Sequence, residues 1–301
     1  MKFIDLCAGI GGFHHALHQI GWQCVYASEI NPTARKVYED NFKDISPELF
    51  EGKLFNEDIY ECDTADIPDF DVICAGFPCQ PFSQIGYKKG FTEDLEGRGN
   101  LFFELTRIIR DKQPKVLFLE NVRHIVKHDR GRTFARIRDE IKELGYSFSW
   151  EVIRASDFGL PQHRPRTFMI GFRGEKDHDC YFDFPKSQKL EMTMSDIFGG
   201  ECDRDVGFTL RLGGMGSGIE DRRNWDAYRV DGEVVRLQVE HAKKMQGFPE
   251  QFLLPKSRAK GLRLLGNSVA TNVVREIGVQ IEKYVTSKDE FKKGKQMRMA
   301  L

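Results

Sequence analysis

Residues 2–13, "KFIDLCAGIGGF", reveal the most about how this chain folds. The segment "KFIDLCA" has the apolar character of a buried strand, and an amphipathic helix is expected from about Phe13. The turn between them is rich in glycine, and such a turn lets the backbone of a helix N-terminus approach a ligand closely. The stretch therefore predicts a strand, a ligand-binding turn and a helix at the start of an α/β fold.

The same alternation of apolar strands and amphipathic helices continues through the first half of the chain. Nearly continuous apolar strands that alternate with helices are typical of a parallel sheet covered on both faces. The predicted fold class is therefore α/β, with a doubly wound, mostly parallel sheet closed by an antiparallel pair. The expected strands are 24–30, 71–76, 116–122, 146–155 and 166–173, and the expected helices are 31–42, 100–114 and 131–146.

The domain organisation follows a change in composition near Arg173. Residues 174–262 are rich in glycine, aspartate and arginine, which predicts a small, loop-dominated second domain after a first domain at 1–173. Residues 263–301 return to a helical pattern whose apolar face suits docking on the sheet. We expect this last segment to end in a charged tail that frays from Ser287.

Composition narrows the class of protein. A hydrophobic content of 40% and a charged content of 30% predict a folded chain with a sizeable core. No apolar run approaches the roughly 18 residues of a membrane helix, so a soluble, cytosolic protein without membrane contact is expected. Seven cysteines without a CxxC pair argue against a disulfide framework and against a metal site of the structural zinc type.

Charge is distributed unevenly along the chain. The net charge is −1, which gives no overall sign of nucleic-acid binding. Residues 123–138 and 256–263 are nevertheless strongly basic. Each run fits either a phosphate-binding surface or an ordinary exposed helix face.

The stretch "AGFPCQPFSQ", residues 75–84, holds one cysteine between two prolines. Prolines at 78 and 81 fix the backbone on both sides of Cys79 and remove two amide donors. A nucleophile has to be aimed, whereas a buried structural cysteine needs no such frame. We therefore interpret Cys79 as a nucleophile, with a small buried hydrophobe as the alternative.

Two acids stand where a cofactor is expected. Glu29 ends the second predicted strand, where an acid can accept from ribose hydroxyls, and Asp58 lies near the end of a third, where it can accept from an adenine amino group. The glycine spacing differs from that of a phosphate-binding dinucleotide loop, so a dinucleotide is not favoured. The alternative is a glycine turn beside ordinary surface acids.

Several motifs together resemble those of the cytosine carbon-5 DNA methyltransferases. "FIDLCAGIGGF", Glu29, "GFPCQPFS", "ENV", "QHRPRTFMIGFR" and "GNSV" occur in that family's order, and the resemblance covers residues 3 to about 284. It implies a Rossmann-like catalytic domain that binds S-adenosylmethionine and releases S-adenosylhomocysteine. It also implies that 174–262 is a target-recognition domain, with double-stranded DNA between the two domains.

The resemblance further implies a bacterial or phage enzyme of the restriction-modification type. Such an enzyme would be a monomer located in the cytosol or nucleoid, and a separate endonuclease would act on the same site. The family's chemistry assigns the attack on carbon 6 of a flipped cytosine to Cys79. It assigns nitrogen 3 to Glu120, oxygen 2 to Arg166, and help in positioning the loop or the nucleophile to Arg164.

Two further sets of residues follow from the resemblance. The expected cofactor-binding residues are Cys7, Ala8, Gly9, Ile10, Gly11, Gly12, Glu29, Ile30, Asp58, Ile59, Pro78, Leu101, Asn267, Ser268 and Val269. The expected DNA-binding residues are Gln80, Ser83, Ile85, Lys88, Lys89, Arg98, Thr209, Arg211, Arg222, Arg223 and Asn224.

This sequence departs from the family pattern at two places. Cys7 stands where the family usually has phenylalanine, and the recognition domain is short, so residues 205–233 have to carry most of the base reading. The alternatives are a tRNA cytosine-5 methyltransferase and a catalytically silent DNA-binding relative. The tRNA branch carries a Cys-Phe-Thr tripeptide that is absent from this sequence, and the intact set of Cys79, Glu120 and the two arginines argues against a silent protein.

Overall fold

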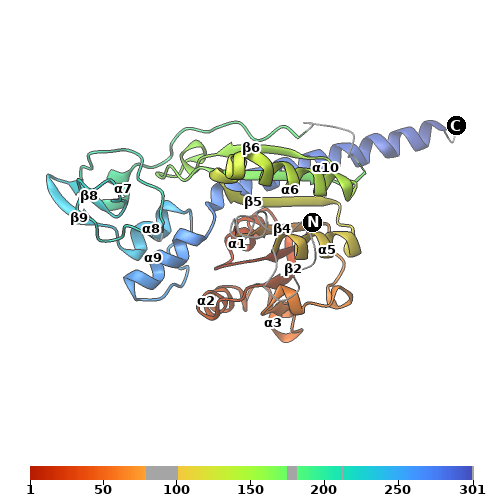
Figure 1. Cartoon of the computed structure of the whole chain (residues 1–301), viewed down its shortest axis with the longest axis horizontal. Coiled ribbons are helices and arrows are strands. Elements are labelled where there is room, and N and C mark those ends of the chain that lie inside the picture. The colour runs from red at the N-terminus through yellow and green to blue at the C-terminus, as the bar shows by residue number, and fades with distance from the viewer. Residues whose placement is uncertain (79–100, 175–181, 212, 300–301) are drawn as a thin grey trace.

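The computed structural model describes residues 1–78, 101–174, 182–211 and 213–299. Its centre is a seven-stranded sheet in the order β3-β2-β1-β4-β5-β7-β6, in which β7 runs antiparallel to both of its neighbours and the other pairs are parallel (Figure 1). The predicted doubly wound α/β class and the antiparallel closing pair are thereby confirmed. The strands are β1 (Lys2–Leu6), β2 (Gln23–Ser28), β3 (Phe55–Asn56), β4 (Val72–Gly76), β5 (Val116–Val122), β6 (Ser149–Ile153) and β7 (Arg166–Phe172).

Helices cover both faces of this sheet because alternate strand residues point to opposite sides. One apolar core includes residues of α1, α2 and α10, and the other is formed with α5 and α6. Asn31 caps α2 through its side chain and Pro32 occupies the first turn, as the sequence predicts. The helices of this part are α1 (Gly12–His18), α2 (Pro32–Phe42), α3 (Pro47–Glu51), α5 (Leu101–Lys112), α6 (Arg132–Glu143) and α10 (Thr271–Met299).

Short 3-10 helices connect several of these elements. Three of them follow strands, η2 lies between η1 and β4, and η4 leads into α6. Their bounds are η1 (Ile59–Glu61), η2 (Thr64–Asp66), η3 (Arg123–Val126), η4 (His128–Gly131) and η5 (Ala155–Phe158).

A smaller unit lies at one end of the sheet (Figure 1). It contains α7 (Met194–Phe198), the hairpin of β8 (Ala227–Val230) and β9 (Glu233–Arg236), α8 (Val239–Met245) and α9 (Arg258–Asn267). The boundary predicted after residue 262 falls inside α9, so this helix spans both predicted segments. The division into domains stays a prediction, because apolar residues of this unit belong to the same core as β1 and α1.

The C-terminal helix differs from the sequence-based expectation. Helix α10 continues to Met299, whereas the sequence predicts fraying from Ser287. Val273, Val274, Ile277 and Ile281 bury its first turns against the sheet. Its last turns project away from the rest of the molecule at the end opposite to the smaller unit (Figure 1). Among the described residues, no helix combines the length and the apolar character that crossing a bilayer requires.

Candidate active site

The strand order places a cavity at the carboxyl edge of the sheet. Strand β1 lies between β2 and β4, so the connections diverge there, and open α/β sheets bind ligands at such a switch point. A cavity of about 440 Å³ opens at this edge. Of the residues predicted for the cofactor or the reaction, those that line it are Cys7, Gly9, Ile10, Glu29, Ile30, Asp58, Ile59, Pro78, Leu101, Asn267, Glu120 and Arg166.

The glycine turn and Glu29 form one side of this cavity. The amide of Gly9 donates to Glu29 Oε2 and the amide of Asn31 donates to Oε1, both at 2.8 Å. Burial raises the pKa of Glu29, and the two amides act in the opposite direction. The carboxylate is therefore fixed by backbone donors. Each of its oxygens keeps capacity for a further donor, because a carboxylate oxygen has two lone pairs.

Close packing explains why the first turn and the "GNSV" segment lie together. A Cβ on Gly12 would lie 2.6 Å from Val269 Cγ2 and 2.8 Å from Ser268 Oγ, so only glycine lets α1 approach this segment. At Gly11 a Cβ would lie 2.2 Å from the Phe42 ring, and its φ of 84° also favours glycine. Of the predicted cofactor-binding residues, five do not line the cavity: Ala8, Gly11, Gly12, Ser268 and Val269.

Asp58 follows β3, near the strand end where the sequence places it. Its Oδ1 accepts the amide of Tyr60 at 3.1 Å and so caps η1. The structure adds lining residues that the sequence analysis does not name. They are Ser28, Asn31, Ala34, Glu57, Tyr60, Gly76, Phe77, Asn121, Val122, Leu264 and Gly266, and their position beside named motifs is the signal that indicates them.

Glu120 lies at the carboxyl end of β5, opposite Gly76 of β4. A Cβ on Gly76 would lie 3.4 Å from Glu120 Oε2, so the glycine leaves space beside the carboxyl group. Arg166, the first residue of β7, contacts Glu120 Oε1 through Nε at 3.0 Å. Burial raises the pKa of Glu120 above its ordinary value, although the charges of Arg166 and Arg164 act in the opposite direction. A buried carboxyl group that binds a proton readily suits an acid–base role.

A residue at the end of β5 binds the backbone at Phe77, just before Cys79. Asn121 Nδ2 donates to the carbonyl of Phe77 at 2.9 Å, and Asn121 is buried. This bond ties the strand end that carries Glu120 to the chain two residues before Cys79. The predicted residues that lie outside the described part of the chain are Cys79, Gln80, Ser83, Ile85, Lys88, Lys89 and Arg98.

Arg164, whose positioning role stays a prediction, contacts backbone carbonyls inside the protein. It is buried and does not line the cavity. Its Nη1 donates to the carbonyl of Leu210 at 3.2 Å, and its Nη2 donates to the carbonyls of Gly266, at 2.9 Å, and Ser268. Its φ of 26° lies outside the usual range for a side-chain-bearing residue. Arg164 thus connects the segment that contains Leu210 to the end of α9 and to Ser268, which lies beside the first turn.

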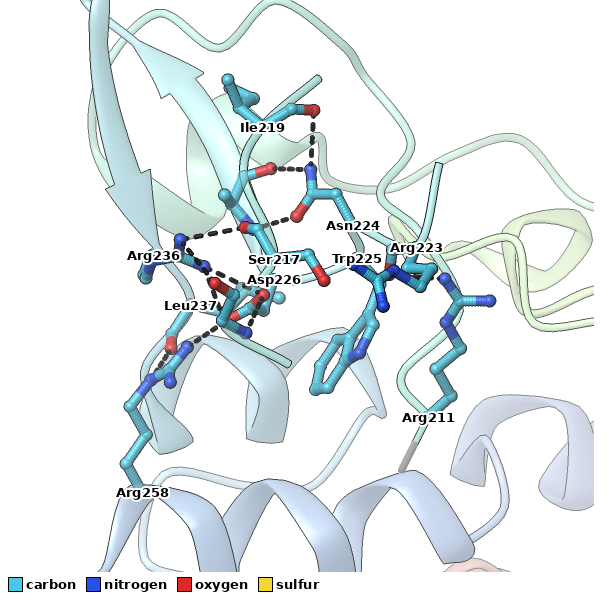
Figure 2. Close-up of polar contacts among 12 residues, drawn as sticks. Arg211, Ser217, Ile219, Arg223, Asn224, Trp225, Asp226, Arg236, Leu237 and Arg258 are labelled. Carbon is cyan, nitrogen blue, oxygen red and sulfur yellow. Dashed lines mark hydrogen bonds and ion pairs between the residues drawn. The ribbon is translucent and has the colours of Figure 1, made fainter. Parts of the chain in front are cut away.

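The four polar residues predicted to read bases after position 210 occupy different environments, and Figure 2 shows three of them, Arg211, Arg223 and Asn224. Asn224 is buried: its Nδ2 donates to the carbonyl of Ala227 at 2.9 Å, and its Oδ1 accepts the amide of Ala227 at 3.0 Å. These contacts engage the Asn224 side chain inside the loop, and its base-reading role stays a prediction. Arg223 pairs with Asp221, while Arg211 donates to the carbonyl of Arg223 at 2.6 Å.

The remaining two candidates are less constrained. Arg222 is exposed and has no hydrogen bond or ion pair to any described residue, so its guanidinium is available to a ligand. Thr209 is half-buried on the segment next to Leu210. Of the recognition candidates in the described part of the chain, Arg222 therefore has the greatest freedom to contact a base.

Asp226 connects the loop that contains Gly216 to α9 and β9 (Figure 2). Its carboxylate is fully buried and contacts Arg258 of α9 at 2.6 Å and Arg236 of β9 at 3.2 Å. It also accepts the amide of Gly216 at 3.1 Å. These cationic and amide partners lower the pKa of Asp226, against the effect of burial. A buried carboxylate with three partners makes the loop a defined structure.

We expect Asn224→Ala to destabilise the fold rather than to change the reading of DNA. The substitution leaves the buried amide and carbonyl of Ala227 without partners, which costs about 2 kcal/mol of unfolding free energy. Arg222→Ala, by contrast, should leave stability within about 0.5 kcal/mol because its side chain is exposed. Urea unfolding of both variants measures the difference. Equal stability of the two would contradict the structural role of Asn224.

Fold and cavity define a class of ligand-binding α/β protein, and comparison with known proteins identifies the family. The family described as C-5 cytosine-specific DNA methylase matches residues 1–211 and 215–283. The chain therefore belongs to the C-5 cytosine-specific DNA methylase family, and it is an enzyme of the DNA cytosine-5 methyltransferase class. The resemblance found in the sequence is confirmed.

Curated relatives match over nearly the whole chain. The type II methyltransferase M.DsaV of Dactylococcopsis salina is 36% identical over an alignment 329 residues long, and the match covers 97% of this chain and 90% of that protein. The type II methyltransferase M.HhaI of Haemophilus parahaemolyticus is 34% identical over 320 residues, which cover 93% of this chain and 94% of that protein.

Solved structures show the same fold. A DNMT2 mutant of Spodoptera frugiperda matches with a TM-score of 0.70 and 20% identity, covering 93% of this chain and 98% of that chain. The Dnmt2 methyltransferase of S. pombe matches with a TM-score of 0.68 and 20% identity, covering 94% and 99%. At this level of identity the likeness concerns the fold alone.

Proposed function

We propose that this chain is a type II DNA methyltransferase that methylates carbon 5 of a cytosine within a short specific site in double-stranded DNA. One observation carries the proposal. In a chain of this family, Glu120 and Arg166 contact each other and line the same cavity as Pro78, the residue before Cys79. Relatives named as type II methyltransferases support the restriction-modification setting. A separate endonuclease, a bacterial cytoplasmic location and a monomeric state belong to the same proposal.

The cavity fits S-adenosylmethionine. Apolar side chains of Ile10, Ile59 and Leu101 suit the adenosine moiety, and the fixed carboxylate of Glu29 suits a hydroxyl pair. Acidic groups at this cavity also suit a cofactor that carries a positive sulfur. When bound, S-adenosylmethionine supplies the electrophilic methyl group. The backbone around Gly9 and the Glu29 and Asp58 side chains would hold it.

The protein's own groups activate the base. In this proposal the Cys79 thiolate adds to carbon 6 of the cytosine, and the displaced electron pair moves toward nitrogen 3. Glu120 donates a proton at nitrogen 3, while Arg166 stabilises oxygen 2 and fixes the Glu120 carboxyl group. Carbon 5 of the resulting enamine is then nucleophilic enough to be methylated. The proton on nitrogen 3 then returns to Glu120 and water accepts the carbon-5 proton. The electron pair of the broken carbon–hydrogen bond re-forms the double bond between carbons 5 and 6, and the sulfur leaves carbon 6 as the thiolate.

The proposal is tested by mapping the methylated position. Purified protein is incubated with isotopically labelled S-adenosylmethionine and unmethylated genomic DNA, with tRNA in a parallel reaction, and the methylated cytosines are sequenced. Label in one short DNA sequence context at carbon 5 is the expected result. Label in tRNA alone would favour the RNA branch, and no label in either nucleic acid would contradict the proposal.

A further inference from the structure

The basic run at 256–263 divides into two groups in the structure. Arg258 is engaged inside the protein, where it pairs with Asp226 and donates to the carbonyl of Leu237 at 2.7 Å. Lys260 and Arg263, in contrast, are exposed and have no hydrogen bond or ion pair to any described residue. Two cations on the exposed face of α9 are therefore available to a ligand.

These two side chains line a second cavity, separate from the one that holds Glu120. It measures about 260 Å³ and lies between α9 and the segment predicted to read bases, residues 205–233, which contributes Arg211. The other lining residues are apolar or aromatic: Met215, Trp225, Ala259 and Leu262. No acidic residue lines this cavity among the described residues. Three cations and several apolar residues around one cavity favour a ligand that is anionic and partly apolar.

The walls of this cavity are fixed by contacts already described. One guanidinium, that of Arg164, binds the carbonyls of Leu210 and Gly266, which sets Arg211 against α9. The buried Trp225 donates through Nε1 to the carbonyl of Gly213 at 2.9 Å. The cavity is thus formed before any ligand binds, which lowers the ordering cost of binding.

The cavity also lies next to the reaction site along the same helix. Ala259, Lys260, Leu262 and Arg263 of α9 line the second cavity, whereas Leu264, Gly266 and Asn267 line the first. Arg263 and Asn267 are about 6 Å apart along the helix axis, at 1.5 Å per residue. A DNA strand whose base enters the first cavity would therefore pass its neighbouring backbone over the second.

We propose that Arg211, Lys260 and Arg263 form a phosphate clamp, which binds a DNA backbone phosphate beside the target cytosine. This proposal rests on the proposed function. The cations meet the phosphate oxygens, and the exposed apolar side chain of Met215 packs against the deoxyribose. Lysine and arginine at exposed helix positions suit a phosphate, which accepts donors from many directions, better than the fixed edge of one base.

The clamp is tested by the salt dependence of DNA binding. Lys260→Gln and Arg263→Gln are compared with wild type by fluorescence anisotropy on two duplexes, one with the mapped target and one with it scrambled. Each variant should bind both duplexes about fivefold to tenfold more weakly near 0.1 M salt. The log of the association constant falls linearly with the log of the salt concentration, and in each variant this slope should be less steep by about 0.9. Arg263→Lys should restore the slope, and Arg110→Gln, an exposed change on α5, should match wild type.

Two results would overturn the clamp. Slopes equal to that of Arg110→Gln would show that these cations do not meet phosphates. A loss confined to the target duplex would identify a base contact instead. Because Lys260 and Arg263 are exposed, circular dichroism melts of the variants should match wild type. Failure of the clamp leaves methylation by the wild-type protein intact, so it is distinguishable from failure of the proposed function.

Discussion

Cys79→Ser is expected to abolish methyl transfer, with a fall of at least about 10³-fold, while S-adenosylmethionine binds within about threefold of wild type. The thiolate acts on the base, whereas the proposed cofactor contacts come from Gly9, Glu29 and Asp58, which do not depend on the thiol. A serine hydroxyl is far more weakly nucleophilic at neutral pH than a cysteine thiolate. Single-turnover methylation and calorimetric titration of the cofactor measure the two effects separately.

The matched control for this variant is Cys202→Ser. Cys202 is a half-buried thiol in the smaller unit, and it lies outside the cavity. Its replacement should leave the single-turnover rate within about twofold. Methylation by Cys79→Ser within tenfold of wild type would contradict the proposed nucleophile.

Glu120→Gln should lower the rate of methyl transfer by between about 10² and 10⁴, which is the usual contribution of a positioned acid. Glutamine can donate a hydrogen bond to the base but cannot give up a proton. The effect should appear in kcat rather than in the affinity for S-adenosylmethionine. Glu143→Gln, an exposed change at the end of α6, is the matched control and should match wild type.

The pH profile gives Glu120→Gln a sharper test. Burial raises the pKa of Glu120, so the protonated form persists to a higher pH than for a free glutamic acid. If that form is the proton donor, the wild-type rate falls as pH rises through the raised pKa. This alkaline fall should be absent from the residual activity of Glu120→Gln. An alkaline fall of equal position in wild type and variant would assign it to another group.

Much of the fold is encoded locally and was predictable from the sequence. Apolar strands, the Asn31 cap and the glycine turn each carry their own physical signal, and the structure has β1, α2 and the antiparallel pair β6 and β7 where the sequence places them. The cavity residues at strand ends were predictable for the same reason, because the carboxyl ends of parallel strands meet at one edge. Glu29 and Glu120 are examples, and Arg166 lies at the same edge because it begins β7, which runs antiparallel to β5.

What the sequence could not supply is the set of partners for each polar side chain. Arg164 and Arg166 are two residues apart in one motif, yet one binds three carbonyls inside the protein and the other reaches the cavity. Arg222 and Asn224 are two residues apart in one polar loop, but only Asn224 is buried. These differences arise from contacts between segments that lie far apart in the chain, and no local pattern encodes them. The length of α10 likewise exceeds what the charged composition of its end predicts.

The central claim is that Cys79 bonds to cytosine during methyl transfer, and trapping that bond tests it most directly. A duplex with 5-fluorocytosine at the mapped target is incubated with the protein and S-adenosylmethionine, and the products are separated on a denaturing gel. Fluorine cannot leave carbon 5 as a cation, so the reaction should stop after methylation with the sulfur still bonded to carbon 6. We expect a protein–DNA band that requires S-adenosylmethionine and is absent with Cys79→Ala. If a verified target gives no such band, covalent catalysis by Cys79 is contradicted.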